Sequence, residues 1–97
     1  MGNALAGRTG DALVAALREL VLRQLPATAA DLGPDSPLGE AGLTSLRTVA
    51  TLVAIEAGLG AELPPELITP DTFRSVRTLA AAIEPVAAAA GPARDRV

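Results

Sequence analysis

Apolar side chains recur every three or four residues in the first part of the chain, the spacing of one face of a helix. The members of this stripe are Leu13, Val14, Leu17, Leu20, Val21 and Leu25. Charged residues, Arg18, Glu19 and Arg23, occupy the opposite face. The pattern predicts an amphipathic first helix that ends before Pro26, because proline lacks the N–H that a helix interior needs.

A stretch rich in glycine and proline follows, from residue 27 to residue 42. Such residues interrupt helices and strands, and here they recur too often for either to persist. The turn residues are Gly33, Pro34, Pro37, Gly39 and Gly42. The sequence therefore predicts a long loop, and loops of this length in small domains are usually functional or disordered.

Apolar residues occupy two faces of the next predicted helix, which begins at about Thr44 or Ser45 and fades at residues 58–60. One set consists of Leu52, Ile55 and Leu59. The other set, about a third of a turn away, consists of Leu46, Val49 and Val53. One set faces the core. The other is either also buried, in a helix deep inside a small bundle, or forms a patch on which a partner docks.

The last third of the chain contains two further helical signals. Thr69 before Pro70 has the cap-then-proline order of a helix start, which predicts one short turn of helix. Ser75 is expected to cap a last helix, which Pro85 disrupts. The apolar positions of that helix are Val76, Leu79, Ile83 and Val86.

These signals together predict an all-α fold, a four-helix bundle with a long loop between helices one and two and a short third helix. No segment shows the alternation of a β-strand, and no internal repeat is visible. We expect one domain over residues 10–86, a flexible N-terminus over residues 1–9 and a flexible C-terminal tail over residues 87–97.

The composition excludes several kinds of chemistry. The chain of 97 residues has no cysteine, histidine, lysine or tyrosine, so only carboxylates can exchange protons near neutral pH. We therefore expect no catalytic residues, no metal site and no activity as a self-sufficient enzyme. The net charge of -3 argues against binding of nucleic acid. No apolar run is long enough to span a membrane and no targeting signal is apparent, which favours a cytoplasmic protein.

One motif lies between residues 35 and 64. Its first part is Asp35, Leu38, Glu40, Gly42, Leu43, Thr44, Ser45 and Leu46. Its second part follows without a gap and consists of Ile55, Glu56, Glu62, Leu63 and Pro64. Phe73 and Ser75 then supply an aromatic residue and a cap at the entry to the last helix. Residues 35–83, about half of the chain, resemble the acyl and peptidyl carrier protein family.

The resemblance implies that Ser45 accepts the 4′-phosphopantetheine group of coenzyme A from a magnesium-dependent phosphopantetheinyl transferase. The thiol at the end of this covalent arm then holds cargo as a thioester. Thr44 is expected to cap the helix, which leaves the Ser45 hydroxyl free. In the family, residues at matching places contact partner enzymes beside the arm. The docking residues expected here are Leu43, Leu46, Arg47, Val49 and Val53.

The chain departs from the family's pattern in its charges. Thr44 replaces the usual aspartate before the serine, so modification either needs a particular transferase or fails. The exposed places of the second helix carry Arg47, Ala50, Ala57 and Gly58, without the strong acidity of fatty-acid carriers. This helix and the segment LITPDTFRSVRTL look more like free-standing carriers of secondary metabolism.

The resemblance thus implies a monomeric carrier of an aminoacyl or small acyl unit in natural-product biosynthesis, as in nonribosomal peptide, polyketide or antibiotic pathways. Its expected partners are the transferase, an adenylating or acyl-loading enzyme, and downstream synthase or tailoring enzymes. Two alternatives stay open. Thr44 motivates an unmodified, carrier-like interaction domain that docks through the apolar stripe. Residues 68–79, with Arg74 and Arg77, also fit a helix-turn-helix reader of DNA, although the acidic total makes that reading remote.

Overall fold

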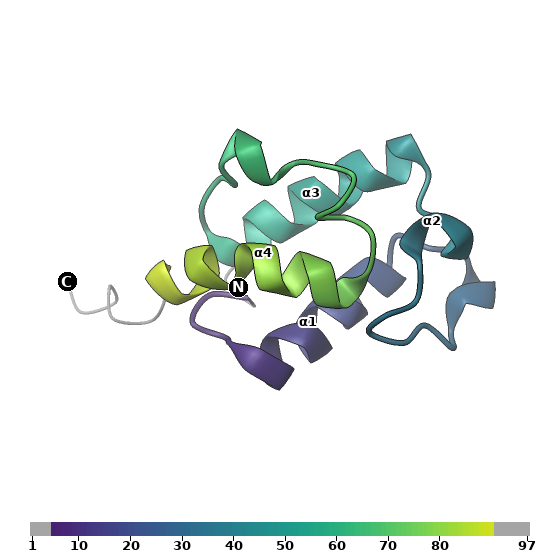
Figure 1. The fold of residues 1–97 in the computed structure, drawn as a ribbon, viewed down its shortest axis with the longest axis horizontal. Coiled ribbons are helices and arrows are strands. Elements are labelled where there is room, and N and C mark those ends of the chain that lie inside the picture. The colour runs from purple at the N-terminus through teal and green to yellow at the C-terminus, as the bar shows by residue number, and fades with distance from the viewer. Residues whose placement is uncertain (1–4, 91–97) are drawn as a thin grey trace.

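The computed structural model describes residues 5–90, and in this range the fold is entirely helical (Figure 1). The α-helices are α1 (Gly10–Leu22), α2 (Leu38–Ala41), α3 (Ser45–Leu59) and α4 (Val76–Ala89). Two 3₁₀ helices, η1 (Ala27–Ala29) and η2 (Pro65–Leu67), lie between them. The expected all-α, four-helix fold is confirmed over the described range. None of its helices is long and apolar enough to cross a membrane.

The three long helices form the body of the molecule, and α1 packs against both α3 and α4. α1 runs in the opposite direction to the other two (Figure 1). Their facing sides are almost entirely aliphatic. Fully buried side chains include Leu13, Leu17, Val21, Ile55, Leu59, Val76, Leu79 and Ile83. Each such side chain stabilises the fold by about 1.5–3 kcal/mol through leaving water.

The apolar stripe predicted for the first helix is the buried face of α1, and the helix ends at Leu22, before Pro26 as predicted. On the polar side, Arg18 reaches the loop that follows. Its Nε donates to the Leu32 carbonyl at 2.7 Å, and its Nη2 donates to the Ala30 carbonyl at 3.1 Å. α1 therefore holds this loop in place as well as supplying core side chains.

The predicted long loop is more ordered than its composition indicates, because it contains η1 and α2. Leu38 begins α2 and is fully buried, and its N–H donates to the Arg74 carbonyl at 2.8 Å. In front of α2, Asp35 accepts a hydrogen bond from the Nε of Arg77 at 2.7 Å. α2 has only 4 residues, which is too short to display a helical period, so no periodic pattern marked it.

The short helix expected at Thr69 and Pro70 lies elsewhere, as the single turn η2 at Pro65–Leu67. Thr69 is a local cap, since its Oγ1 accepts a hydrogen bond from the N–H of Thr72 at 3.2 Å, but only turns follow it. Pro65 stands at the start of η2, where its missing N–H breaks no bond. The helix-turn-helix alternative fails here too, because residues 68–75 contain no helix.

α4 begins where predicted and continues further than predicted. The N–H of Thr78 donates to Ser75 Oγ at 3.1 Å, and the N–H of Ser75 donates to Thr78 Oγ1 at 3.0 Å. Pro85 does not disrupt the helix, which runs to Ala89. The carbonyl left without a donor belongs to Ala81, and both Ala81 and Pro85 are exposed, so water can reach it.

The packed body extends beyond the expected domain limits of residues 10–86. Leu5 is 1% exposed, and its N–H donates to the Gly58 carbonyl at 2.9 Å. The N–H of Gly7 donates to the Ala87 carbonyl at 2.8 Å, within a helix that ends only at Ala89. Residues 1–4 and 91–97 of the expected flexible ends lie outside the described residues, so their flexibility stays a prediction.

Candidate functional site

Ser45 is the first residue of α3, and its side chain is exposed. The cap of this helix is its neighbour Thr44, whose Oγ1 accepts a hydrogen bond from the N–H of Arg47 at 3.2 Å. The Ser45 hydroxyl itself makes no hydrogen bond to the part of the chain that the structure describes. Thr44 and Ser45 therefore have the expected arrangement of a capping hydroxyl beside a free one.

The turn between α2 and α3 aims Ser45 outward. Gly42 ends α2 with φ 112°, in the left-handed region that favours glycine. The N–H of Leu43 then donates to the Leu38 carbonyl at 2.9 Å, and Leu43 is only 9% exposed. Leu43 anchors the turn in the core, so its position does not support the expected role as a docking residue.

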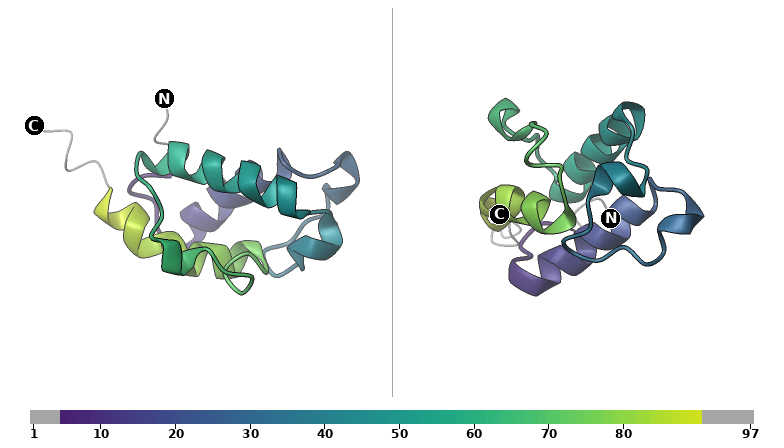
Figure 2. Two further views of the ribbon diagram at one scale, coloured as in Figure 1. Left: turned by 90° about the horizontal axis from the view of Figure 1, so that it is seen from above. Right: turned by 45° about the vertical axis from the view of Figure 1, so that its right-hand side comes forward.

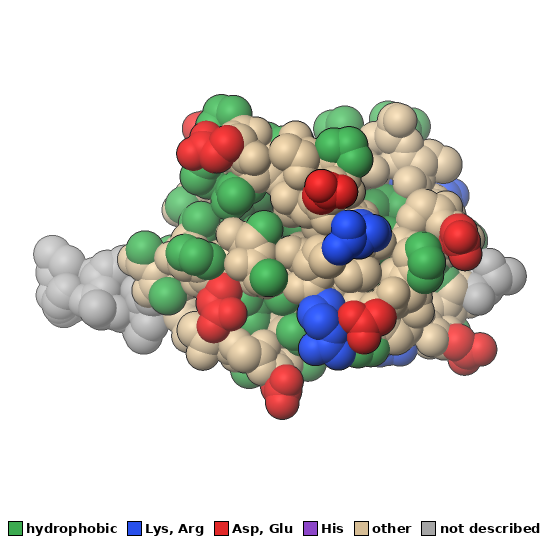
Figure 3. Space-filling model, viewed as in Figure 1, with side chains coloured by type: hydrophobic (Ala, Val, Ile, Leu, Met, Phe, Trp, Pro, Cys, Tyr) green, Lys and Arg blue, Asp and Glu red, His purple; other side chains and the backbone are tan. Residues whose placement is uncertain are grey.

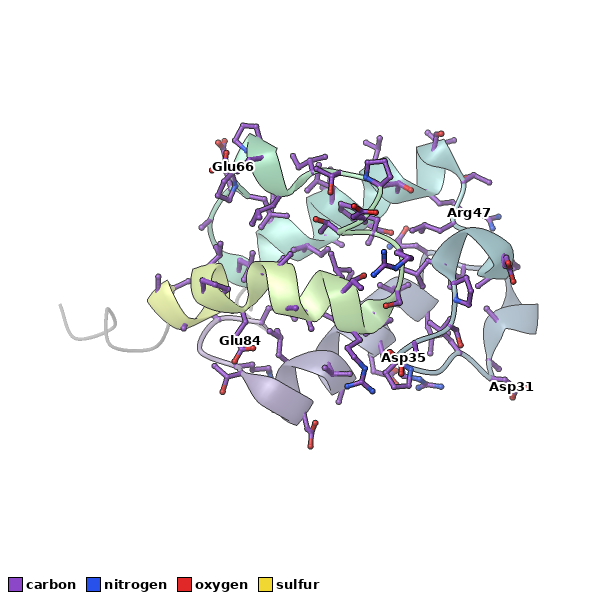
Figure 4. All side chains as sticks on the ribbon, in the orientation of Figure 1. Asp31, Asp35, Arg47, Glu66 and Glu84 are labelled. Atoms are coloured by element: carbon purple, nitrogen blue, oxygen red, sulfur yellow. The ribbon has the colours of Figure 1, made fainter. Side chains whose placement is uncertain are left out.

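The start of α3 favours a negative charge on Ser45. The first N–H groups of a helix have no partner inside the helix, and the dipole places partial positive charge there. The first turn of α3 carries no acidic side chain. Arg47 lies at the rim of the molecule where α3 begins, and its Nη1 donates to the Gly42 carbonyl at 3.3 Å (Figure 4). The unpaired N–H groups and the dipole, rather than Arg47, therefore favour a phosphate ester on the Ser45 oxygen.

A groove of about 640 Å³ opens beside Ser45. Its walls come from α2, from the start of α3, and from the crossover segment, residues 60–75, that joins α3 to α4. Most of the lining is apolar, with Phe73 on the crossover side, and its charged side chains are Glu40 and Arg74. Sequence reasoning missed this groove, because no local pattern marks a surface that three separate segments build together.

The outer face of α3 carries the second apolar set of the sequence. Leu46, Val49 and Val53 are 80%, 57% and 60% exposed, whereas Ile55 and Leu59 on the inner face are buried. α3 lies along one edge of the body, so no other helix covers its outer face (Figure 2). This outer set is surplus to the core, and the alternative of a helix buried on all sides is wrong.

The residues around this outer set carry little charge. Arg47, Ala50 and Ala57 are exposed, as expected from the sequence. Gly58 is buried instead, because Leu5 packs on it so closely that a Cβ at Gly58 would lie 3.0 Å from the Leu5 Cγ. The exposed residues of α3 thus include one cation and no carboxylate.

Two acidic residues of the motif have structural partners. The Oε2 of Glu56 accepts a hydrogen bond from the N–H of Leu63 at 3.0 Å, which closes the turn after α3. Asp35 lies in the loop before α2 (Figure 4), and its contact with Arg77 raises the pKa of that guanidinium through a hydrogen bond and charge attraction. These carboxylates hold the segments that frame the groove.

Other charged side chains are dispersed. Figure 3 shows basic side chains beside acidic ones on the face that carries α4, in agreement with ion pairs of Arg74 with Asp71 and of Arg77 with Asp35. This face offers nucleic-acid phosphates no broad basic area. Within residues 5–90, no group of three or more acidic side chains is placed to hold a metal ion.

Comparison with known proteins assigns this arrangement to a family. Residues 15–83 match the family model described as "Phosphopantetheine attachment site", a span that contains all of α2 and α3. The chain belongs to this family. The expected membership among acyl and peptidyl carrier proteins is thereby confirmed, and the cofactor of this carrier domain is covalently attached 4′-phosphopantetheine.

Two curated relatives of the carrier domain come from Bradyrhizobium diazoefficiens. Aminoacyl carrier protein 1 is 42% identical over 53 residues, which cover 55% of this chain and 59% of the relative. Aminoacyl carrier protein 2 is 39% identical over 56 residues, which cover 58% of this chain and 63% of the relative. The carrier domain thus matches these curated relatives over less than two thirds of their length.

Two solved structures share the fold of the carrier domain. One is an engineered Bradyrhizobium japonicum glycine:[carrier protein] ligase complexed with carrier protein from Agrobacterium tumefaciens and ATP. Its matched chain has a TM-score of 0.65 and 26% identity, and the match covers 73% of this chain and 95% of that chain. The other is the Bradyrhizobium japonicum ligase complexed with glycylated carrier protein, with a TM-score of 0.61 and 33% identity, covering 68% and 90%.

Proposed function

We propose that this protein carries an aminoacyl or small acyl unit as a thioester on a phosphopantetheine arm attached to Ser45, and that it is a substrate of other enzymes rather than a catalyst. The main support is the free, exposed hydroxyl of Ser45 at the start of α3, inside the span that matches the family. The helix start stabilises a phosphodiester at this position.

The residues around Ser45 fit the group. Thr44 caps the start of α3 by accepting a hydrogen bond from the N–H of Arg47, and the buried Leu43 fixes the turn before it. The Ser45 oxygen is therefore available to form a bond to phosphorus. That oxygen gives up its proton as the bond forms, and adenosine 3′,5′-bisphosphate leaves from coenzyme A. The chain has no histidine, so the transferase is expected to supply the base. Once attached, the group supplies a terminal thiol that forms the thioester.

An aminoacyl cargo is favoured by the relatives. Both curated relatives are named aminoacyl carrier proteins, and one solved relative is a glycylated carrier protein with a glycine ligase. We infer that an ATP-dependent ligase adenylates an amino acid and loads it onto the arm. A place in nonribosomal peptide or polyketide biosynthesis, with downstream synthase or tailoring enzymes, rests on the sequence resemblance, as do a monomeric state and a cytoplasmic location.

The outer set on α3 is proposed as the surface that these enzymes contact. Leu46, Val49 and Val53 form an exposed apolar row that begins beside Ser45, where an enzyme acting on the arm must approach. Arg47 is the cation at the same end. Docking therefore relies on apolar contact more than on attraction to a basic enzyme surface.

An unmodified interaction domain is the second candidate function. It is favoured by Thr44, which removes the acidic side chain expected before the serine. The outer set on α3 would then bind partners without an arm. The two functions differ in one observable quantity, the mass of the protein after exposure to a transferase.

Intact-protein mass spectrometry after incubation with coenzyme A, magnesium and a broad-specificity phosphopantetheinyl transferase tests the proposal. The parent protein should gain one phosphopantetheinyl group and Ser45→Ala none, because Ser45 carries the exposed, free hydroxyl at the start of α3. Thr48→Ala is the matched control, since Thr48 lines the same groove but its hydroxyl is bonded to the Thr44 carbonyl at 2.9 Å. This control should gain the group.

Circular dichroism should show that Ser45→Ala stays folded, because the cap at Thr44 is intact. A mass gain on Ser45→Ala would place the attachment site elsewhere. No gain on the parent with several transferases would favour the interaction domain instead.

A further inference from the structure

Arg74 is the cation of the groove beside Ser45. The described residues of the lining include two charged side chains, Glu40 from α2 and Arg74 from the crossover segment. A phosphodiester on Ser45 adds a negative charge to the same groove. Glu40 repels that charge and Arg74 attracts it, so the electrostatics of the groove are asymmetric.

The backbone of Arg74 is fixed while its side chain is free to turn. Its carbonyl accepts the hydrogen bond from the N–H of Leu38 at 2.8 Å, and the next residue, Ser75, is the buried cap of α4. The side chain is 64% exposed, and its Nη1 lies 3.6 Å from the Oδ1 of Asp71, which is 93% exposed. Such exposed pairs are weak, so a better anion can replace Asp71.

Other arginines near the site are less suited to this role. Arg47 follows Ser45 by two positions, which turns it about 200° around the helix axis, away from the side of Ser45. Thr48, three positions on, returns to that side and lines the groove. Arg47 also donates to the Gly42 carbonyl at 3.3 Å. Arg77 is occupied by Asp35 at 2.7 Å.

We propose that Arg74 is a positioning residue, which exchanges Asp71 for the phosphodiester on Ser45. This inference rests on the proposed attachment of the arm at Ser45. A guanidinium can donate two parallel hydrogen bonds to phosphate oxygens, which fixes direction as well as distance. Arg74 thereby draws the first part of the arm toward the crossover segment. The outer face of α3 stays clear for partner enzymes.

The test uses phosphoserine at position 45, installed by chemical synthesis of the chain, so that it needs no transferase. The second pKa of a phosphoserine is about 6 and can be followed by phosphorus NMR during a pH titration. A nearby cation lowers this pKa because it favours the doubly charged form. Arg74→Gln should therefore raise it, with at least about a twofold fall in the acid constant, and added salt should reduce the difference.

Arg47→Gln is the matched control, because it removes a cation that is close in sequence but turned away from Ser45. It should leave the phosphate pKa unchanged. Both variants should remain folded, since both side chains are exposed. An equal pKa in the parent and in Arg74→Gln, or a larger change in Arg47→Gln, would overturn the proposal.

The protein bearing the arm gives a second readout. The Nε–H NMR signal of Arg74 should shift between the unmodified and modified forms, while that of Arg77 should not. A protein that gains the arm without this shift would lose only the role of Arg74. A protein that gains no arm would lose the proposed function, whatever the phosphoserine titration shows.

Discussion

Gly42 and Thr44 set how Ser45 is presented. Gly42 turns the chain out of α2 through a left-handed backbone conformation. Thr44 caps α3 by accepting a hydrogen bond from the N–H of Arg47. The Ser45 hydroxyl therefore has no structural role at the start of α3. A substitution at Ser45 should then affect chemistry alone, whereas substitutions at its neighbours should affect the backbone that presents it.

Gly42→Ala should lower the free energy of unfolding by about 1–3 kcal/mol, because a left-handed backbone strains any residue with a Cβ. That Cβ would also lie 2.9 Å from the Cδ of Pro26. Gly39→Ala is the matched control in the same short helix, where a Cβ meets nothing within 4 Å. It should stabilise by about 0.5–1 kcal/mol. Urea unfolding measures the free energy of unfolding of both variants, and equal changes would contradict backbone strain at position 42.

At the scale of residues, a motif with fixed spacing predicts Ser45 as the attachment site and Thr44 as the cap, and the structure shows the cap at Thr44. The expected exposure of Gly58 is wrong, and Leu43, expected to contact partners, is buried. Leu43 precedes the helix, so helical periodicity says nothing about its direction. Gly58 is buried by Leu5, from the opposite end of the chain, and no local pattern reports such a contact.

α3 is a helix with two apolar faces, one buried and one exposed. Its inner face, with Ile55 and Leu59, closes the core. Its outer face presents Leu46, Val49 and Val53 to solvent, and an exposed apolar row of this kind is the surface that we propose for partner docking. Because the core does not need the outer face, changes there should separate partner recognition from folding.

Val49→Asp should reduce the kcat/KM of the transferase for this protein by about tenfold or more, because a charge would have to be buried in an apolar contact. Stability should change by less than about 1 kcal/mol, since Val49 is 57% exposed. The matched control is Ala15→Asp, an exposed position on α1, which should leave kcat/KM unchanged. Unchanged kinetics in Val49→Asp would remove the outer face from recognition by this enzyme.

At the scale of elements, the three long helices follow from sequence because each spans several turns with a repeating apolar face. The short helices could not be predicted in this way, because α2, η1 and η2 have 4, 3 and 3 residues and are too short to show a repeating apolar face. The expected disruption at Pro85 is absent, because the Ala81 carbonyl, which loses its N–H donor, belongs to an exposed residue that water can reach.

The whole molecule is held together by contacts between the beginning, middle and end of the chain. Leu5 packs on α3 and Gly7 bonds to α4, so the segment before α1 ties the two helices together. This segment belongs to the flexible N-terminus expected over residues 1–9, and no helical period marks Leu5 as a core residue. Its single buried leucine could be recognised only in three dimensions.

Leu5→Ala should lower the free energy of unfolding by about 2–4 kcal/mol, since a fully buried leucine leaves a cavity when shortened. Thr9→Ala is the control from the same segment, exposed and without a side-chain bond as a helix cap. Its effect should stay within about 0.5 kcal/mol. Thermal and urea unfolding would measure both. A small effect of Leu5→Ala would mean that the body begins only at α1.

The backbone hydrogen bonds of Leu5 to Gly58 and of Gly7 to Ala87 place the start of the described body beside the C-terminal ends of α3 and α4. Ser45 stands at the opposite end of α3, about 20 Å away at 1.5 Å per residue. A fluorescent label attached near Gly7 would therefore lie at the opposite end of the body from Ser45. An arm on Ser45, as proposed, would stay accessible to enzymes in a protein that is labelled at that end.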